Sequence, residues 1–174
     1  MDPSDGEDPL ILTLALDEAS LARFDAERRE FFPPRLNRIP AHVTLVHHLP
    51  GAEEVAVLGA LREACAGQGP VAARVTEVFP LGRGVAYRLE TPEVAALRAG
   101  LARGWEGWLT PQDRQPWRPH VTVQNKVTPE IARDTLARLR AGFVPWEARA
   151  EGLLLWRYRG GPWDAVAAIP FAGA

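Results

Sequence analysis

Cysteine is almost missing from this chain of 174 residues, which holds Cys65 alone. A single cysteine forms no intrachain disulfide and no cysteine-rich metal site, and this composition fits a reducing compartment. An excess of positive charge is missing too, because the formal net charge is -2. Domains that hold long nucleic acids by neutralising phosphates are usually strongly basic, so the composition argues against that class. A small anionic substrate or an RNA end stays open.

The chain also lacks an apolar run long enough to span a membrane. The run from Leu10 to Leu16 is far shorter than the roughly 20 residues that a spanning helix needs, and it lacks the basic flank of a signal peptide. Residues 1–8 hold little apolar surface, which predicts a disordered leader. Residues 9–174 are long enough for one core, so we expect a single domain in a cytoplasmic protein.

Hydrophobic periodicity, with proline and glycine at the boundaries, predicts a mixed sequence of strands and helices. Strands are expected at 10–16, 41–49, 71–79, 84–90, 119–126, 146–150, 152–159 and 163–170. Helices are expected from Asp17 or Ser20 to about 31, at 53–66, from Thr91 to about 105 or 108, and at 128–142. An arginine-bearing loop, a strand, a turn and a helix follow one another twice. This layout predicts an α+β domain with two similar lobes, antiparallel sheets facing a central cleft and helices outside.

One short motif occurs twice within this layout. Residues 42–45 read His-Val-Thr-Leu and residues 120–123 read His-Val-Thr-Val, 78 positions apart. Side chains alternate between the faces of a strand, so His42 and Thr44 are expected on one face, and His120 and Thr122 likewise. Each motif therefore presents an imidazole beside a hydroxyl.

Two histidines facing one cleft are suited to general acid and base catalysis. A neutral imidazole removes a proton from a nucleophile while a protonated one donates a proton to the leaving group, and each transfer typically contributes about 10²–10⁴ in rate. The threonine hydroxyls are suited to donating hydrogen bonds to phosphoryl oxygens. The repeated motif therefore indicates chemistry at a phosphate.

The two motifs resemble those of the two-histidine (2H) phosphoesterase superfamily, which includes the bacterial 2′-5′ RNA ligase-like proteins and RNA 2′,3′-cyclic phosphodiesterases. The resemblance covers about residues 10–171. It implies a bilobal fold and metal-independent, cofactor-free cleavage of a cyclic phosphodiester. His42 and His120 would be the acid–base pair, and Thr44 and Thr122 would bind the phosphate. The implied substrate is an RNA end or a small cyclic nucleotide, with no membrane and no obligatory protein partner.

Further residues near the motifs are candidates for substrate binding. Arg118, His48 and Lys126 are predicted to contact the substrate, Arg118 because it lies two residues before His120, and the other two because they continue the motif faces together with Gln124. Weaker candidates for phosphate are Arg35, Arg38 and Arg114. Weaker candidates for base stacking are Phe79, Trp117, Trp156 and Tyr158.

Other interpretations remain open at this point. Each motif alone would suit an ordinary strand, although the pair is poorly explained in that way. His42, His47 and His48 form a possible metal site, but consecutive residues point to opposite faces and no cysteine or acidic side chain stands beside them. An RNA-end or nucleotide-binding module without turnover is an alternative, and so is 2′-5′ RNA ligase activity. The physiological substrate, the roles of acid and base, and the oligomeric state are not predicted.

Overall fold

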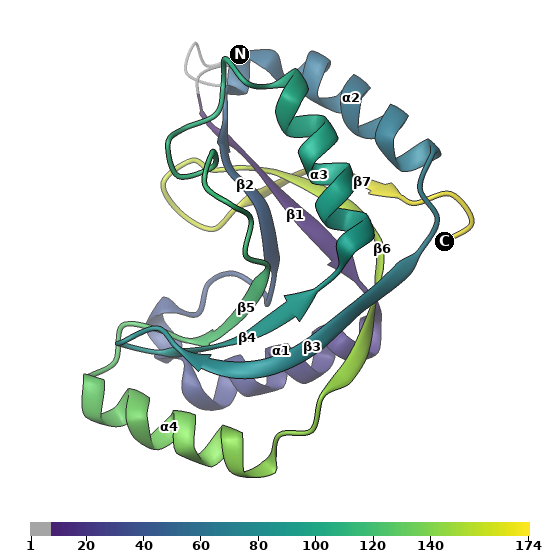
Figure 1. The fold of residues 1–174 in the computed structure, drawn as a ribbon. Helices are drawn as coiled ribbons and strands as arrows, with labels where there is room; N and C mark the ends of the chain where they lie inside the picture. Colours follow the sequence, from purple (N-terminus) through teal and green to yellow (C-terminus); the bar gives the residue numbers. More distant parts are fainter. Residues whose placement is uncertain (1–7) are drawn as a thin grey trace.

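The computed structural model describes residues 8–174, and the predicted leader lies outside the described residues except for Asp8. Figure 1 shows the elements in chain order. The strands are β1 (Leu10–Leu16), β2 (Val43–Leu49), β3 (Val71–Pro80), β4 (Val85–Glu90), β5 (His120–Gln124), β6 (Trp146–Arg157) and β7 (Asp164–Pro170). The helices are α1 (Glu18–Phe31), α2 (Glu54–Ala66), α3 (Pro92–Gly104) and α4 (Pro129–Gly142), with short 3-10 helices η1 (Pro34–Leu36) and η2 (Gly51–Glu53).

The strands form one antiparallel sheet, in the order β2-β1-β6-β3-β4-β5, with β7 also paired to β6. Strand β6 belongs to both lobes: residues 146–150 pair with β3, and residues 152–157 pair with β7 on one side. On its other side, residues 150–157 pair with β1. The predicted α+β architecture with two lobes is confirmed, and the sheets that we expected in the separate lobes are one curled sheet.

The prediction of two strands at 146–150 and 152–159 is wrong, because β6 runs through both segments. Its partners shift register where Ala15 faces Gly152 and Leu16 faces Ala150, so Glu151 forms a bulge. In the sequence, Gly152 suggests a break between two strands. In the structure it allows close approach of β7, since a Cβ atom there would lie 2.5 Å from the carbonyl oxygen of Ile169.

The helices cover the outside of the sheet in two pairs (Figure 1). Helices α2 and α3 lie together over one lobe, and α1 and α4 lie against the other, where α1 packs on β5 and α4 on β3. Helix α1 follows β1 directly in the chain, but it packs on β5, so the chain crosses from one lobe to the other between β1 and α1. The side chain of its N-cap, Asp17, accepts a hydrogen bond from the backbone of Ser20 at 3.0 Å, as its position predicts.

The curl of the sheet brings its two end strands together. Strand β2 and strand β5 stand at opposite ends of the hydrogen-bonded order, yet their Cα atoms come within 8 Å of each other. The indole Nε1 of Trp117, just before β5, donates to the carbonyl oxygen of Thr44 at 2.9 Å. Since β2 and β5 carry the two motifs, the fold places the motifs side by side.

None of the helices in the described part of the chain combines the length and the apolar character needed to cross a lipid bilayer.

We predict that Gly152→Ala destabilises the protein by about 1–3 kcal/mol, because the added methyl group would overlap the backbone of β7. Gly59→Ala in α2 is the matched control. The same methyl group meets no atom within 4 Å there, and alanine in a helix is favoured over glycine by up to about 1 kcal/mol. Urea unfolding followed by circular dichroism measures both changes, and equal effects of the two variants would contradict the close approach.

Candidate active site

Both motif histidines have the same hydrogen bond. Nδ1 of His42 lies 2.8 Å from the carbonyl oxygen of Pro40, and Nδ1 of His120 lies 2.8 Å from that of Arg118. A carbonyl oxygen only accepts, so each Nδ1 carries the proton. The neutral ring then has its lone pair on Nε2. Each motif therefore holds its histidine in the tautomer that leaves Nε2 free to exchange protons with a substrate.

Two buried arginines bond to the backbones of the motif strands. Arg28 on α1 donates through Nη1 to the carbonyl oxygen of Thr122 at 2.8 Å. Arg98 on α3 donates through Nε to the carbonyl oxygen of Leu45 at 2.7 Å. Each helix thus binds the motif strand of the lobe against which it packs.

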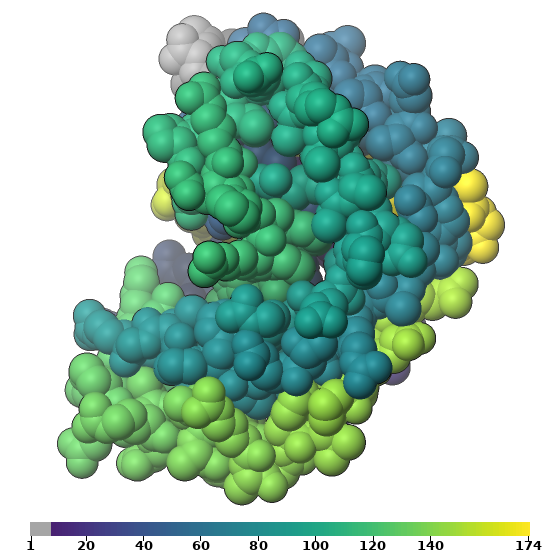
Figure 2. All heavy atoms as spheres, viewed as in Figure 1, coloured from purple at the N-terminus to yellow at the C-terminus, as the bar shows by residue number. Residues whose placement is uncertain are grey.

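A cavity of about 380 Å³ lies beside the motifs. Its wall includes Thr44 of the first motif, His120 of the second motif, and Arg118. Most of the remaining lining comes from the loop between α3 and β5, whose green spheres lie on the visible face in Figure 2. The other lining residues are Leu45, His47, Arg98, Gln112, Asp113, Gln115, Pro116 and Trp117. The predicted contact residue Arg118 is thus brought to the same cavity as the second histidine.

Strand β2 does not keep the alternation that placed His48 on the motif face. Thr13 pairs with Thr44 but Leu12 pairs with Val46, so an extra residue is accommodated in β2. The bulge reverses the facing of the residues that follow. His47 consequently lines the cavity, whereas His48 is exposed and is not part of the cavity wall.

Asp113 fixes the position of His47. The carboxylate accepts hydrogen bonds from the His47 ring at 2.9 Å, from the His47 backbone at 2.9 Å and from the His48 backbone at 3.1 Å. Burial by itself raises the pKa of Asp113, but these hydrogen bonds and the charge of His47 outweigh it and hold that pKa below its usual value. Asp113 is therefore an ionised, buried anchor.

The second motif strand also has a bulge near its end. Thr122 pairs with Ala86 and Gln124 pairs with Val85, so Gln124 turns away from the motif face. The expectation that Gln124 shares this face is wrong: it is buried, and its amide donates to the hydroxyl of Thr135 at 2.8 Å. Lys126 follows the strand with a φ of 62° and is exposed, away from the cavity wall.

The weaker arginine candidates lie outside the cavity. Arg38 donates to the backbone of Arg35 at 3.3 Å, and Arg114 donates to the backbone of Glu106 at 3.4 Å.

Aromatic rings flank both histidines. Trp163, in the connection between β6 and β7, lies 4.8 Å from the ring of His42, centroid to centroid. Phe79 meets the ring of His120 edge-on at 6.0 Å. Among the stacking candidates, Trp117 lines the cavity and Trp156 lies 6.1 Å from Trp163. The sequence did not point to Trp163, because the β6–β7 connection holds no motif residue.

The environment lowers the pKa of His42 to about 4. Burial is the largest cause, the bond to the carbonyl of Pro40 acts against it, and the charges of Arg28, His120 and His47 lower the pKa further. His42 is therefore neutral at pH 7.

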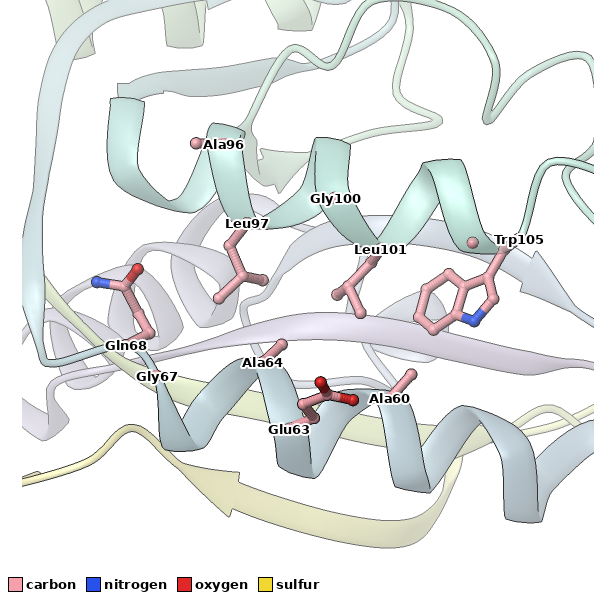
Figure 3. A pocket seen from close by; sticks show the side chains of 11 residues that line it. Ala60, Glu63, Ala64, Gly67, Gln68, Ala96, Leu97, Gly100, Leu101 and Trp105 are labelled. Carbon is pink, nitrogen blue, oxygen red and sulfur yellow. The ribbon is translucent and has the colours of Figure 1, made fainter.

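A larger groove, of about 480 Å³, lies between α2 and α3 (Figure 3). Its walls are mostly alanine, glycine and leucine, and the two motifs take no part in them. Within residues 8–174, no group of three or more histidine, cysteine or acidic side chains is placed to hold a metal ion. The cavity beside the motifs is therefore the candidate active site.

Comparison with known proteins agrees with this geometry. The model of the 2′-5′ RNA ligase superfamily matches residues 16–162. The chain belongs to the 2′-5′ RNA ligase superfamily. The predicted resemblance to the 2H phosphoesterases is confirmed. No curated protein matches the chain.

Solved structures share the fold of this superfamily member. TT0787 of Thermus thermophilus superposes with a TM-score of 0.66 and 22% identity, over 95% of this chain and 98% of the other. LigT of E. coli in complex with 3′-AMP superposes with a TM-score of 0.63 and 13% identity, over the same shares of the two chains. A structure described as a phosphoesterase gives 0.62 and 16%, again over 95% and 98%.

The sequence analysis did not point to the two arginines that bond to the motif strands, although a signal for them exists. Arg28 lies four residues after Phe24, and Arg98 lies four residues after Val94, on the apolar faces of their helices. An arginine at a core-facing position needs buried acceptors, and here these are strand carbonyls. Asp113 has no such signal, because it lies in an irregular loop.

We predict that His42 makes the stability of this superfamily member fall in mild acid. Between pH 6.5 and 4 the unfolded ring binds a proton that the folded ring excludes, so the free energy of unfolding decreases as the pH falls through this range. On going from pH 7 to 5, the wild type should lose about 2 kcal/mol more than His42→Gln. Urea unfolding at both pH values measures the difference, and parallel losses would contradict the lowered pKa.

Proposed function

We propose that this protein is a metal-independent phosphodiesterase that hydrolyses 2′,3′-cyclic phosphates at RNA ends or in small cyclic nucleotides. The observation that carries the proposal is the matched setting of His42 and His120, each with Nδ1 bonded to the carbonyl two residues earlier and Nε2 free. A binding module has no need of two proton-transfer groups held in one tautomer. The similar fold of E. coli LigT, solved with 3′-AMP, supports a nucleotide substrate.

The proposed reaction is an in-line displacement at phosphorus. His42 is the general base, because a pKa of about 4 leaves its Nε2 unprotonated at neutral pH. It removes a proton from water as the new P–O bond forms. His120 donates a proton from Nε2 to the ribose oxygen as the old P–O bond breaks. The product is a phosphomonoester, and exchange of protons with solvent restores both rings.

Thr44, Thr122 and Arg118 are the proposed phosphate contacts. The two hydroxyls would donate to the nonbridging oxygens, whose negative charge increases in the transition state. The Arg118 guanidinium is exposed at the cavity wall and suits paired hydrogen bonds to phosphate. His48 and Lys126 do not line the cavity and are not included in this set. Thr122 does not line it either, but it is included because it shares the strand face of His120.

The first test is the hydrolysis of 2′,3′-cyclic nucleotides, and of a short RNA ending in a cyclic phosphate, in the presence of EDTA. We expect turnover by the wild type and a loss of about 10²–10⁴ in kcat for His42→Ala and for His120→Ala. The double variant should lose much less than the product of the two single losses, because the histidines act as a pair. Circular dichroism checks that the variants are folded. Near-normal turnover by His120→Ala would refute the proposal, and an inactive wild type would favour a binding module.

The threonines allow a second test that hardly changes side-chain shape. Thr44→Val and Thr122→Val remove a hydroxyl and keep the β-branched side chain, so the strands should persist. Each variant should lower kcat by about 10²–10³, the usual cost of one donor to a developing oxyanion. A change in KM alone would indicate that the hydroxyl binds the ground state and the transition state equally.

A further inference from the structure

We infer that the end of the cavity at His47 binds a second phosphate group of the substrate, one sugar away from the cyclic phosphate that reacts. This inference rests on the proposed function and narrows its substrate class. The substrate would be a nucleoside 2′,3′-cyclic phosphate that also carries a phosphate on its 5′ oxygen. That phosphate can be a terminal monoester or the diester of an RNA chain.

The first observation is that His47 is held rigidly with one ring nitrogen free. Its Nδ1 and its backbone N–H both bond to Asp113, a carboxylate that is almost fully buried. These bonds fix the ring and leave Nε2 without a partner within residues 8–174. The His47 side chain remains 46% exposed, so a ligand can reach it. A buried anchor behind an accessible ring is an arrangement that positions a ligand contact.

The second observation is the charge of the cavity. Two arginines and two histidines line it, against a single carboxylate, that of Asp113. Arg98 is buried and donates to the carbonyl oxygens of Leu45 and Asp113, so the exposed guanidinium of the wall is that of Arg118. The Asp113 carboxylate is already occupied by donors from His47 and His48. Because Nδ1 is bonded to Asp113, Nε2 is the ring atom of His47 that is left to bond a ligand. The wall therefore offers donors and positive charge, which suit a phosphate.

The third observation is the position of His47 relative to the reacting centre. Thr44 and His47 lie three residues apart on β2, a separation of at most about 10 Å along a strand. Thr44 and His120 line the same continuous cavity. With the cyclic phosphate between the motifs, the ribose extends into this cavity, and its 5′ oxygen lies on the side of the sugar away from the 2′ and 3′ oxygens. A 5′ phosphate would then lie toward His47.

The test compares substrates that differ in the second phosphate. The probes are cytidine 2′,3′-cyclic phosphate, its 5′-phosphorylated derivative, and a dinucleotide ending in the same cyclic phosphate. For the wild type we expect the second phosphate to raise kcat/KM about tenfold, the usual value of a charge-assisted hydrogen bond. In His47→Gln the ratio of kcat/KM with and without the second phosphate should fall to about one, whatever the change in kcat/KM for the unphosphorylated probe. The monoester and the dinucleotide distinguish a terminal phosphate from an RNA chain.

His48→Gln is the matched control, because it removes the neighbouring exposed histidine outside the cavity wall. It should keep the full gain. Asp113→Asn should lose the gain with His47 intact, since the anchor of the ring is weakened. If all probes are hydrolysed equally, or if His47→Gln keeps the gain, the inference is wrong while the proposed function stands.

A binding measurement keeps the two proposals distinguishable if the wild type turns nothing over. Calorimetry of cytidine 3′-phosphate and cytidine 3′,5′-bisphosphate should show about tenfold tighter binding of the bisphosphate to the wild type and to His48→Gln, but not to His47→Gln. That result with no turnover would refute the hydrolase and support the second site. Equal affinities of the two ligands would refute the second site.

Discussion

The open edges of two strands are the constraint on which this site depends. Strands β2 and β5 are the ends of the sheet order, so each has one row of backbone groups without a strand partner. Side chains satisfy these groups: Arg98 bonds to Leu45, Trp117 to Thr44 and Arg28 to Thr122. Because the same strands carry the histidines and threonines, the bonds that satisfy the edges also fix the proposed reacting groups. The candidate site therefore lies at the two edges of the sheet, where backbone groups have no strand partner.

The two lobes repeat the same arrangement, but their histidines have different surroundings. His42 lies against Trp163, and His120 meets Phe79 edge-on. Burial and nearby positive charge lower the pKa of His42 to about 4. A symmetric pair would have no built-in preference for which ring is neutral. The aromatic cover over His42 therefore contributes the asymmetry that an acid and a base require.

The sequence predicts this fold as far as strict alternation holds. The two motifs, the four helices and the pairing of arginine loop with motif strand follow from periodicity, proline and glycine. The errors in the predicted facing of side chains lie at bulges. A bulge in β2 brings His47 to the cavity in place of His48, and a bulge in β5 turns Gln124 inward. A bulge depends on the pairing with the neighbouring strand, so one strand's sequence does not reveal it. Asp113 was missed for a related reason, because its partners are 65 and 66 positions away.

Arg28 connects the architecture with the chemistry. A buried guanidinium loses hydration, and burial accordingly lowers the pKa of Arg28, yet the group remains charged because the ordinary pKa of arginine lies far above neutrality. An apolar side chain at position 28 would have a smaller desolvation cost, but it would remove the hydrogen bond to the carbonyl oxygen of Thr122. The retained charge also lowers the pKa of His42, although Arg28 is bonded to the other motif. One side chain thus positions the second motif and favours the neutral, basic form of the histidine in the first.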